Sequence, residues 1–176
     1  MNNKLQSIIG NLEKGSKLEL GNNENFSNEI LLDASLQCSV LGGINFVNVT
    51  FKNTDFTGSF FSKTIFENCR FNNIIFRKAE FWNCTFQDCQ VKESNLTRAE
   101  FNSSIFRNCE FLNSNLKASN FMDCEFRETT FKNSNLKLIL AWDVRLWESN
   151  KYIEIKDSSN FASILKDMNL ISTDEM

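Results

Sequence analysis

The chain has 176 residues, the length of a single domain, and a formal net charge of −3 at pH 7. It contains no histidine and no proline, whereas phenylalanine occurs 18 times. Without histidine, a Cys–His nucleophile and a Cys/His metal site are excluded. The sequence also lacks P-loop, dinucleotide-binding and nucleophile-elbow motifs, so it predicts neither an enzyme nor a cofactor site.

Residues 1–33 are predicted to form an N-terminal helical cap and an irregular first coil. One helical face is made of apolar residues, namely Leu5, Ile8, Ile9 and Leu12. We expect this helix to cover the open end of the structure that follows, because an uncovered end exposes unpaired backbone groups. Glu24 and Glu29 occupy positions that small residues hold later in the chain, and a charge there predicts an irregular coil.

Residues 34–148 follow a five-residue period without a break. Every fifth residue from Leu36 to Leu146 is apolar, and the residue two positions earlier, from Ala34 to Val144, is always small or apolar. The other three positions of each five are mostly polar. Such a period matches neither an α-helix nor a β-strand. It predicts a solenoid, in which each repeat buries its apolar groups against its neighbours.

Several pentapeptides share an order of small, polar and apolar residues: Ala79-Glu80-Phe81, Ser94-Asn95-Leu96, Ala99-Glu100-Phe101 and Ser114-Asn115-Leu116. This rhythm resembles the pentapeptide repeat family. The resemblance implies an all-β solenoid, a right-handed quadrilateral (four-sided) β-helix in which residues 20 apart stack on one face. At 20 residues per coil, residues 34–148 give about six coils, each about 4.8 Å from the next. Short helical caps are expected at both ends.

Stacking at this interval predicts a column of rings inside the solenoid, the core ladder. It consists of Phe46, Phe66, Phe86, Phe106 and Phe126. Five of the six cysteines, all except Cys38, lie at the small inward position. Their spacing is not that of a zinc site, and stacked Cβ atoms about 4.8 Å apart are wider than a disulfide prefers. We therefore interpret them as small hydrophobic residues, and reduced thiols favour a cytoplasmic protein.

Two outward surfaces stand out once residues 20 apart are stacked. The candidate interaction face joins acidic residues to exposed tryptophan and methionine: Glu80, Trp82, Glu100, Met122, Asp123, Trp142 and Asp143. A neighbouring basic face carries Arg77, Lys78, Arg98, Lys117 and Lys137. The first surface predicts a protein-binding site, while solvation alone also explains either row of charges.

Residues 149–176 are predicted to form a C-terminal capping segment with a short helix. A short extended piece is expected at Tyr152, Ile153 and Ile155, and the helix can be capped by Asp157, Ser158 or Ser159. The apolar side of the helix contains Phe161, Ile164, Leu165 and Met168. Two roles remain open for this side, a lid over the last coil or the pairing of two molecules in a homodimer.

A regular solenoid with a filled centre is convex and offers few pockets, which favours a non-enzymatic protein. The preferred function is a rigid scaffold for protein–protein interaction, with an unknown protein partner. The alternative is a DNA mimic that binds DNA gyrase or topoisomerase, since some members of the resembled family do so and give quinolone resistance. Mimicry requires a broadly acidic surface, whereas acids and bases nearly balance over residues 34–148.

Nucleic-acid binding through the basic face is disfavoured, because the whole chain is negative and no aromatic residues are interleaved with the cations. A membrane span is not predicted either. The longest apolar run, residues 138–142, is far too short to cross a bilayer.

Overall fold

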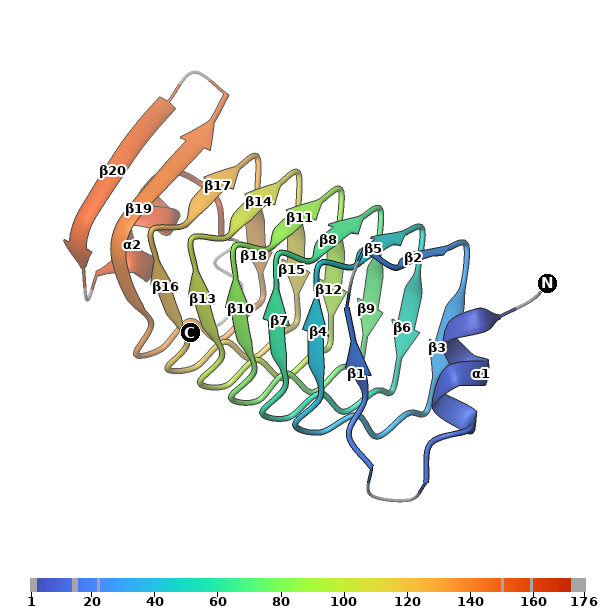
Figure 1. The fold of residues 1–176 in the computed structure, drawn as a ribbon. Helices are drawn as coiled ribbons and strands as arrows, with labels where there is room; N and C mark the ends of the chain where they lie inside the picture. Colours follow the sequence, from blue (N-terminus) through green and yellow to red (C-terminus); the bar gives the residue numbers. More distant parts are fainter. Residues whose placement is uncertain (1–2, 14–15, 22, 150, 159, 172–176) are drawn as a thin grey trace.

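The computed structural model of the protein describes residues 3–13, 16–21, 23–149, 151–158 and 160–171. Short parallel strands stack coil upon coil into a tower, with one helix near each end of the chain (Figure 1). The helices are α1 (Lys4–Gly10) and α2 (Phe161–Asp167). Neighbouring coils pair residues that are 20 apart, as in Glu80 with Glu100 and Phe81 with Phe101. A four-sided parallel β-solenoid of about six coils is therefore confirmed.

Strands form three of the four sides. The first face contains β1 (Glu19–Leu20), β4 (Val40–Gly42), β7 (Phe60–Ser62), β10 (Glu80–Trp82), β13 (Glu100–Asn102) and β16 (Asn120–Met122). The second face contains β2 (Asn25–Ser27), β5 (Asn45–Val47), β8 (Ile65–Glu67), β11 (Thr85–Gln87), β14 (Ile105–Arg107) and β17 (Glu125–Arg127). The third face contains β3 (Ile30–Leu32), β6 (Thr50–Lys52), β9 (Arg70–Asn72), β12 (Gln90–Lys92), β15 (Glu110–Leu112) and β18 (Thr130–Lys132).

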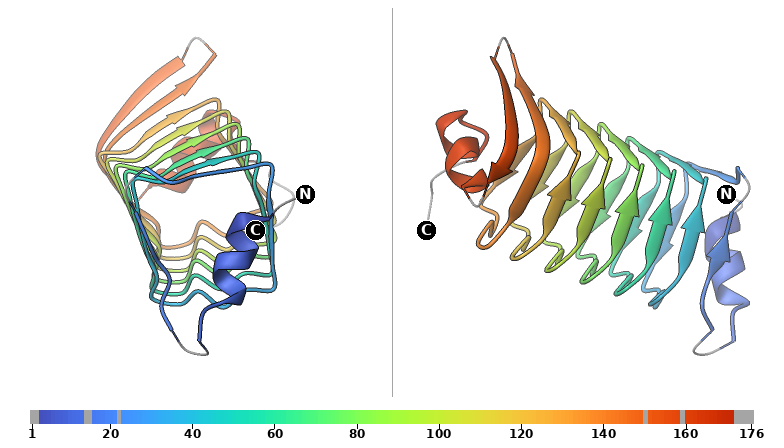
Figure 2. Two further views of the ribbon diagram at one scale, coloured as in Figure 1. Left: turned by 45° about the vertical axis from the view of Figure 1, so that its right-hand side comes forward. Right: turned by 60° about the vertical axis from the view of Figure 1, so that its left-hand side comes forward.

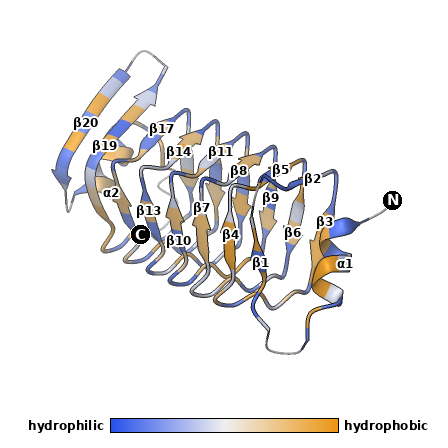
Figure 3. Ribbon diagram, in the orientation of Figure 1, coloured by the Kyte–Doolittle hydropathy of each residue, from blue (hydrophilic) through white to orange (hydrophobic). Residues whose placement is uncertain are grey.

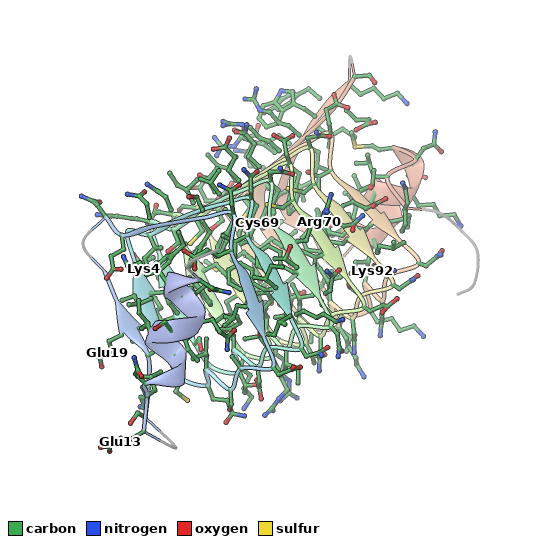
Figure 4. The ribbon with its side chains drawn as sticks, turned by 90° about the vertical axis from the view of Figure 1, so that its right-hand side faces the viewer. Lys4, Glu13, Glu19, Cys69, Arg70 and Lys92 are labelled. Carbon is green, nitrogen blue, oxygen red and sulfur yellow. The ribbon has the colours of Figure 1, made fainter. Side chains whose placement is uncertain are left out.

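The fourth face is held by single parallel bridges instead of strands. These bridges join Ser35, Asp55, Ile75, Asn95, Asn115 and Asn135 in order along the tower. Polar side chains project outward around the other sides, including Arg70 and Lys92 on the third face (Figure 4).

Each corner of the tower is turned by one residue in the left-handed conformation. Every fifth residue from Asn28 to Asp143 has a positive φ, and Asn, Asp and Gly hold most of these positions. These three residue types tolerate the left-handed region best, which explains much of the asparagine in the repeat. Asparagine amides also bond between coils, as from Asn68 to Asn48 and from Asn73 to Asn53. Asn95, on the fourth face, instead accepts the N–H of Thr97 within its own turn.

The interior is filled by stacked phenylalanine rings. Successive rings of the core ladder lie 5.3, 4.8, 4.9 and 4.7 Å apart between centroids, from Phe46 to Phe126. Rings of the neighbouring column meet them edge to face, as Phe81 meets Phe86 at 5.6 Å. Both arrangements are favourable for aromatic quadrupoles. The small inward residues fill the corners, and Ser104 donates its hydroxyl to the carbonyl of Phe81 in the preceding coil.

The N-terminal end is closed by α1, which lies across the first coil (Figure 2). The Glu29 carboxylate accepts the N–H of Leu5 at 2.7 Å, in the first turn of this helix. The Gln6 side chain accepts the N–H of Leu32 at 3.0 Å, so α1 also pairs the edge of β3. The first coil is regular, in contrast to the prediction, because β2 and β3 pair with β5 and β6 at the same interval of 20 residues. The Glu29 carboxylate is accommodated there because it bonds to the backbone of α1.

The C-terminal end is closed by two elements. The nine-residue β19 (Leu140–Glu148) bends across a corner, pairing first with β16 and then with β17. The antiparallel β20 (Lys151–Ser158) covers β19 and is longer than the short extended piece predicted there. The ring of Phe161 lies 5.8 Å from that of Phe121, so α2 plugs the open core.

The apolar side of α2 is turned inward. Phe161, Leu165 and Met168 are buried, and the carbonyl of Leu170 accepts the N–H of Phe131 on the edge of β18. Asn160 holds the N-cap position, in place of the predicted Asp157 or Ser158. The third predicted cap, Ser159, lies outside the described residues.

We expect Phe86→Asp to prevent stable folding, because it places an unpaired charge between rings 4.8 and 4.9 Å away. The loss should exceed about 4 kcal/mol, whereas the matched control Phe86→Leu should cost only about 1–2 kcal/mol. Thermal melting followed by circular dichroism measures both variants. Near-native melting of the aspartate variant would contradict the stacked core.

Thiol reactivity should separate Cys38 from the other cysteines. Burial raises the pKa of the Cys84 and Cys124 thiols to about 12, so only about 10⁻⁴ of each is thiolate at pH 8. Cys38 is exposed, while the remaining five are buried. A colorimetric thiol reagent should modify one residue in native protein and all six after denaturation. Rapid native modification of more than one thiol would show that the coils open.

Candidate functional site

The glutamate, tryptophan and methionine residues of the candidate interaction face lie on four neighbouring strands, β10, β13, β16 and β19. Trp82, Met122 and Trp142 occupy one register column, in which Asn102 fills the coil between Trp82 and Met122. Their side chains are 43%, 47% and 39% exposed. Strand alternation explains this, because the preceding residue of each strand points into the core. The structure thus brings three large, partly exposed side chains onto one flat sheet.

Glu80 and Glu100 form the acidic part of this face. They are register neighbours at the first position of β10 and β13, about 4.8 Å apart as strand neighbours. The Trp82 indole donates to a Glu80 carboxylate oxygen at 3.3 Å, which orients the ring beside the acid. Within the described part of the chain, neither glutamate forms an ion pair. Both charges are therefore open to a partner.

Asp123 and Asp143 behave differently from the two glutamates. Both lie at corners with positive φ, beside the second face. The Asp123 carboxylate accepts Arg145 at 3.2 Å, and that of Asp143 lies 3.6 Å from the ammonium group of Lys156. These ion pairs offset the charge of the aspartates, so Glu80 and Glu100 carry the acidic character of the face.

Two residues that the sequence analysis did not single out extend the apolar part of this surface. Leu140 is 37% exposed at the start of β19, and Leu138 is 72% exposed at the preceding corner. With Met122 and Trp142 they form an apolar patch on the last two coils. The sequence contains a signal for Leu138, because the residues that hold the same corner position in other coils include polar ones such as Lys78 and Arg98. A leucine at this outward position is therefore unusual. β4 and β7, at the other end of the face, are also largely hydrophobic (Figure 3).

The basic face borders the candidate interaction face at a corner. All five of its cations, Arg77, Lys78, Arg98, Lys117 and Lys137, are exposed on turns of the fourth face. Among residues with described positions, none of the five has an ion-pair partner within 4.0 Å. Burial opposes ionisation of nearby Asp55, but hydrogen bonds from Thr57 and Gln37 outweigh it and lower the Asp55 pKa.

Several charges of the second and third faces, toward the C-terminal end of the tower, are paired. Glu125 pairs with Arg107 and Arg127, and Glu110 accepts Lys132 at 2.7 Å. Hydrogen bonds from Lys132 and Gln90 lower the pKa of Glu110. Paired charges of this kind favour a solvated surface over a binding site.

Neither a metal centre nor a membrane helix is found in the described ranges. No group of three or more His, Cys, Asp or Glu side chains there is placed to hold a metal ion. No helix in the same ranges is long and apolar enough to cross a bilayer. A groove of about 580 Å³ runs beside β20 and α2, remote in sequence from the two glutamates of the candidate face.

The fold and the surface define a class of protein: a repeat solenoid with a filled aromatic core, closed ends and a flat outward sheet. Two family models show which family within that class the chain belongs to. "Pentapeptide repeat region" matches residues 59–139, and "Pentapeptide repeats (8 copies)" matches residues 34–73. Together these matches span more than half of the chain, which belongs to the pentapeptide repeat proteins. No curated protein sequence matches it.

Solved structures with a similar chain course include two kinds of pentapeptide repeat protein. A trypsin-treated single-residue variant of QnrB1, described as a plasmid-mediated fluoroquinolone resistance protein, is 18% identical, with 88% of this chain and 100% of that chain covered and a TM-score of 0.46. Rfr23 from the cyanobacterium Cyanothece 51142 is 13% identical, with 74% and 91% covered and a TM-score of 0.35. At these values neither likeness carries an argument about activity or partner.

The end of β19 supplies a pH-dependent test. Burial, and then the neighbouring Glu128 carboxylate, raise the pKa of Glu148. Ionised Glu148 therefore destabilises the folded state at neutral pH, and this cost disappears as pH falls below the unfolded value of 4.5. Glu148→Gln should raise stability at pH 7 by about 0.5 kcal/mol, discounted for solvent screening.

Urea unfolding of both proteins at pH 7 and pH 3.5 measures this difference. The stability gain of the variant should vanish at pH 3.5, where the Glu148 side chain of wild type is protonated and therefore as neutral as the glutamine that replaces it. A variant that is less stable than wild type at pH 7 would show that the Glu148 carboxylate is favourably bound.

Proposed function

We propose that this protein is a non-enzymatic scaffold that binds a protein partner through the candidate interaction face. The observation that supports this most directly is the register column in which Trp82, Met122 and Trp142 stand partly exposed. Tryptophan and methionine are enriched at protein interfaces, and tryptophan is prominent among the residues that dominate binding energy. Single exposed apolar residues are ordinary on a solvated surface, whereas three in one column of a rigid sheet are typical of an interaction site.

Rigidity makes this surface suited to binding. Each strand of the face is hydrogen-bonded to strands on both sides, and each of its inward side chains is packed in the core. Binding of a partner therefore orders little additional backbone, so the entropy cost of association is smaller than for a flexible segment. A preformed sheet also keeps Glu80 and Glu100 at a fixed separation from the exposed rings.

The charges of the face define what its partner should carry. Glu80 and Glu100 favour basic side chains opposite them, while Met122, Leu140 and Trp142 favour apolar ones. The neighbouring cations Lys78 and Arg98 repel a basic surface that extends past the corner. The best match is thus a partner segment that is narrow, basic at one end and apolar at the other.

DNA mimicry toward DNA gyrase is the alternative function, which the resemblance to the pentapeptide repeat family raised. The charge arrangement argues against it, because exposed cations interrupt the corner beside Glu80 and Glu100 and the Asp123 and Asp143 charges are offset by ion pairs. A gyrase supercoiling assay with and without a quinolone decides between the two functions. Protection of gyrase at micromolar protein would support mimicry, and no effect would remove it.

Substitution of the two tryptophans tests the scaffold function. Trp82→Ala/Trp142→Ala should weaken partner capture by about 2 kcal/mol, or roughly 30-fold, because it removes two anchors. The readout is quantitative capture from lysate of the native cell, followed by a binding titration with the captured protein. Ile65→Ala is the matched control, since Ile65 is 42% exposed on the second face. Equal capture by the double variant and the control would overturn the proposed face.

A further inference from the structure

The basic face carries cations that the described part of the chain does not neutralise. It lies on the fourth face, the side of the tower without strand arrows, and its cations are exposed on four successive coils (Figure 1). No ion pair joins them to any residue of the described ranges. Lys117 and Lys137 hold the same position in neighbouring coils, about 4.8 Å apart along the backbone. Like charges on neighbouring strands are destabilising, so an anionic ligand would remove a repulsion that the free protein carries.

A column of amide donors runs beside these cations. Asn95, Asn115 and Asn135 are joined in order by parallel bridges. In each of them, Oδ1 accepts the backbone N–H two residues later, at 3.0, 3.1 and 3.1 Å. Only the oxygen of an amide can accept an N–H, so this bond leaves the NH₂ group as the free end of the side chain. Among the described residues, these three NH₂ groups have no acceptor.

Most acceptors on this side of the tower are already occupied. The backbone carbonyls of Lys117 and Lys137 accept N–H groups of the preceding coil. The carboxylate of Asp55, one coil before the first cations, accepts the N–H of Thr57 at 2.8 Å and the amide of Gln37 at 2.6 Å. The basic face therefore offers mainly donors and positive charge, and its complement is a ligand rich in anionic acceptors.

Acidic residues limit the width of such a ligand. Glu80 and Glu100 lie just past one corner of the fourth face, and Glu93, paired with Lys92, lies at the other. A broad polyanion such as duplex nucleic acid would meet these carboxylates as well as the cations, and like charges repel. A single nucleic-acid strand lacks aromatic side chains to stack on, because the described outward residues of this face include none. An extended peptide is narrow enough to follow the cations alone.

We propose that the basic face binds an acidic protein segment in extended conformation, with a carboxylate at every second residue. The four coils from Arg77 to Lys137 span about 14 Å, or three strand spacings. In an extended chain, side chains on one side are about 6.7 Å apart, so residues i, i+2 and i+4 span about 13 Å. Three carboxylates thus match the length of the cation row, and backbone carbonyls of the segment can accept the free amide NH₂ groups. This surface is separate from the candidate interaction face and goes beyond the proposed scaffold function.

A labelled peptide of about nine residues, with glutamate and threonine in alternation, is the probe. Fluorescence anisotropy of this peptide, titrated with the full chain at low salt, should show saturable binding. A peptide of the same length with lysine in place of glutamate should not bind. The triple variant Arg98→Gln/Lys117→Gln/Lys137→Gln should weaken binding of the acidic peptide about tenfold, because it removes three cations of the row.

Matched variants separate the face from net charge. Lys63→Gln/Lys151→Gln/Lys166→Gln removes three exposed cations elsewhere and should stay within about twofold of wild type, because screening weakens distant charges. Asn115→Asp keeps an oxygen for the backbone bond but replaces the free NH₂ group with a second oxygen, and should weaken binding about threefold. Gln87→Glu makes the same amide-to-acid change on the second face and should leave binding unchanged.

Circular dichroism melting checks that each variant is folded. Saturable binding of the acidic peptide, weakened by the triple variant of the basic face and by Asn115→Asp but not by the controls, supports the proposal. A wild type that does not bind the peptide up to about 1 mM protein overturns it. Equal loss in both triple variants also overturns it, since net charge alone would then explain binding. Tighter binding of a thymidine oligonucleotide of the same charge would assign the face to nucleic acid and overturn the proposed occupant.

Discussion

Hydrogen bonding of each coil to the next is the constraint on which the rest of this protein depends. Because the rise from coil to coil is one strand spacing, a residue and its counterpart 20 positions later must tolerate direct contact. Phenylalanine satisfies this inside, since parallel rings stack at nearly the same spacing. Outside, the same rule places Glu80 next to Glu100 and Trp82 in line with Trp142. Core and surface are thus consequences of a single geometry.

Periodicity explains why so much of the fold was predictable. The side of the tower on which a residue lies follows from its position within 20, so the inner columns and the outward faces could be assigned from the sequence. The exposed cations of the basic face and the exposed side chains of Trp82, Met122 and Trp142 lie where this counting places them. The left-handed corners could also have been predicted from the sequence, because asparagine, which tolerates a positive φ, recurs at these positions.

What the period could not predict lies where repetition stops. Glu29 looked misplaced because its column is otherwise small, yet at the end of the tower its carboxylate meets the N–H of Leu5. β20 leaves the repeat altogether, and its pairing with β19 depends on a hairpin that has no counterpart in other coils. Charge cancellation at Asp123 and Asp143 likewise required the positions of Arg145 and Lys156. End contacts are single events, so no internal comparison reveals them.

The end caps have a consequence for how such a molecule can change in length. The helix α1 is bonded to the first coil, while β20 and α2 pack on the last. A gene duplication or deletion that adds or removes one whole 20-residue coil would lengthen or shorten the tower by about 4.8 Å and leave both caps with familiar neighbours. Loss of a single residue would instead shift every later phenylalanine out of its column. The length of this protein can therefore change in evolution only by whole coils.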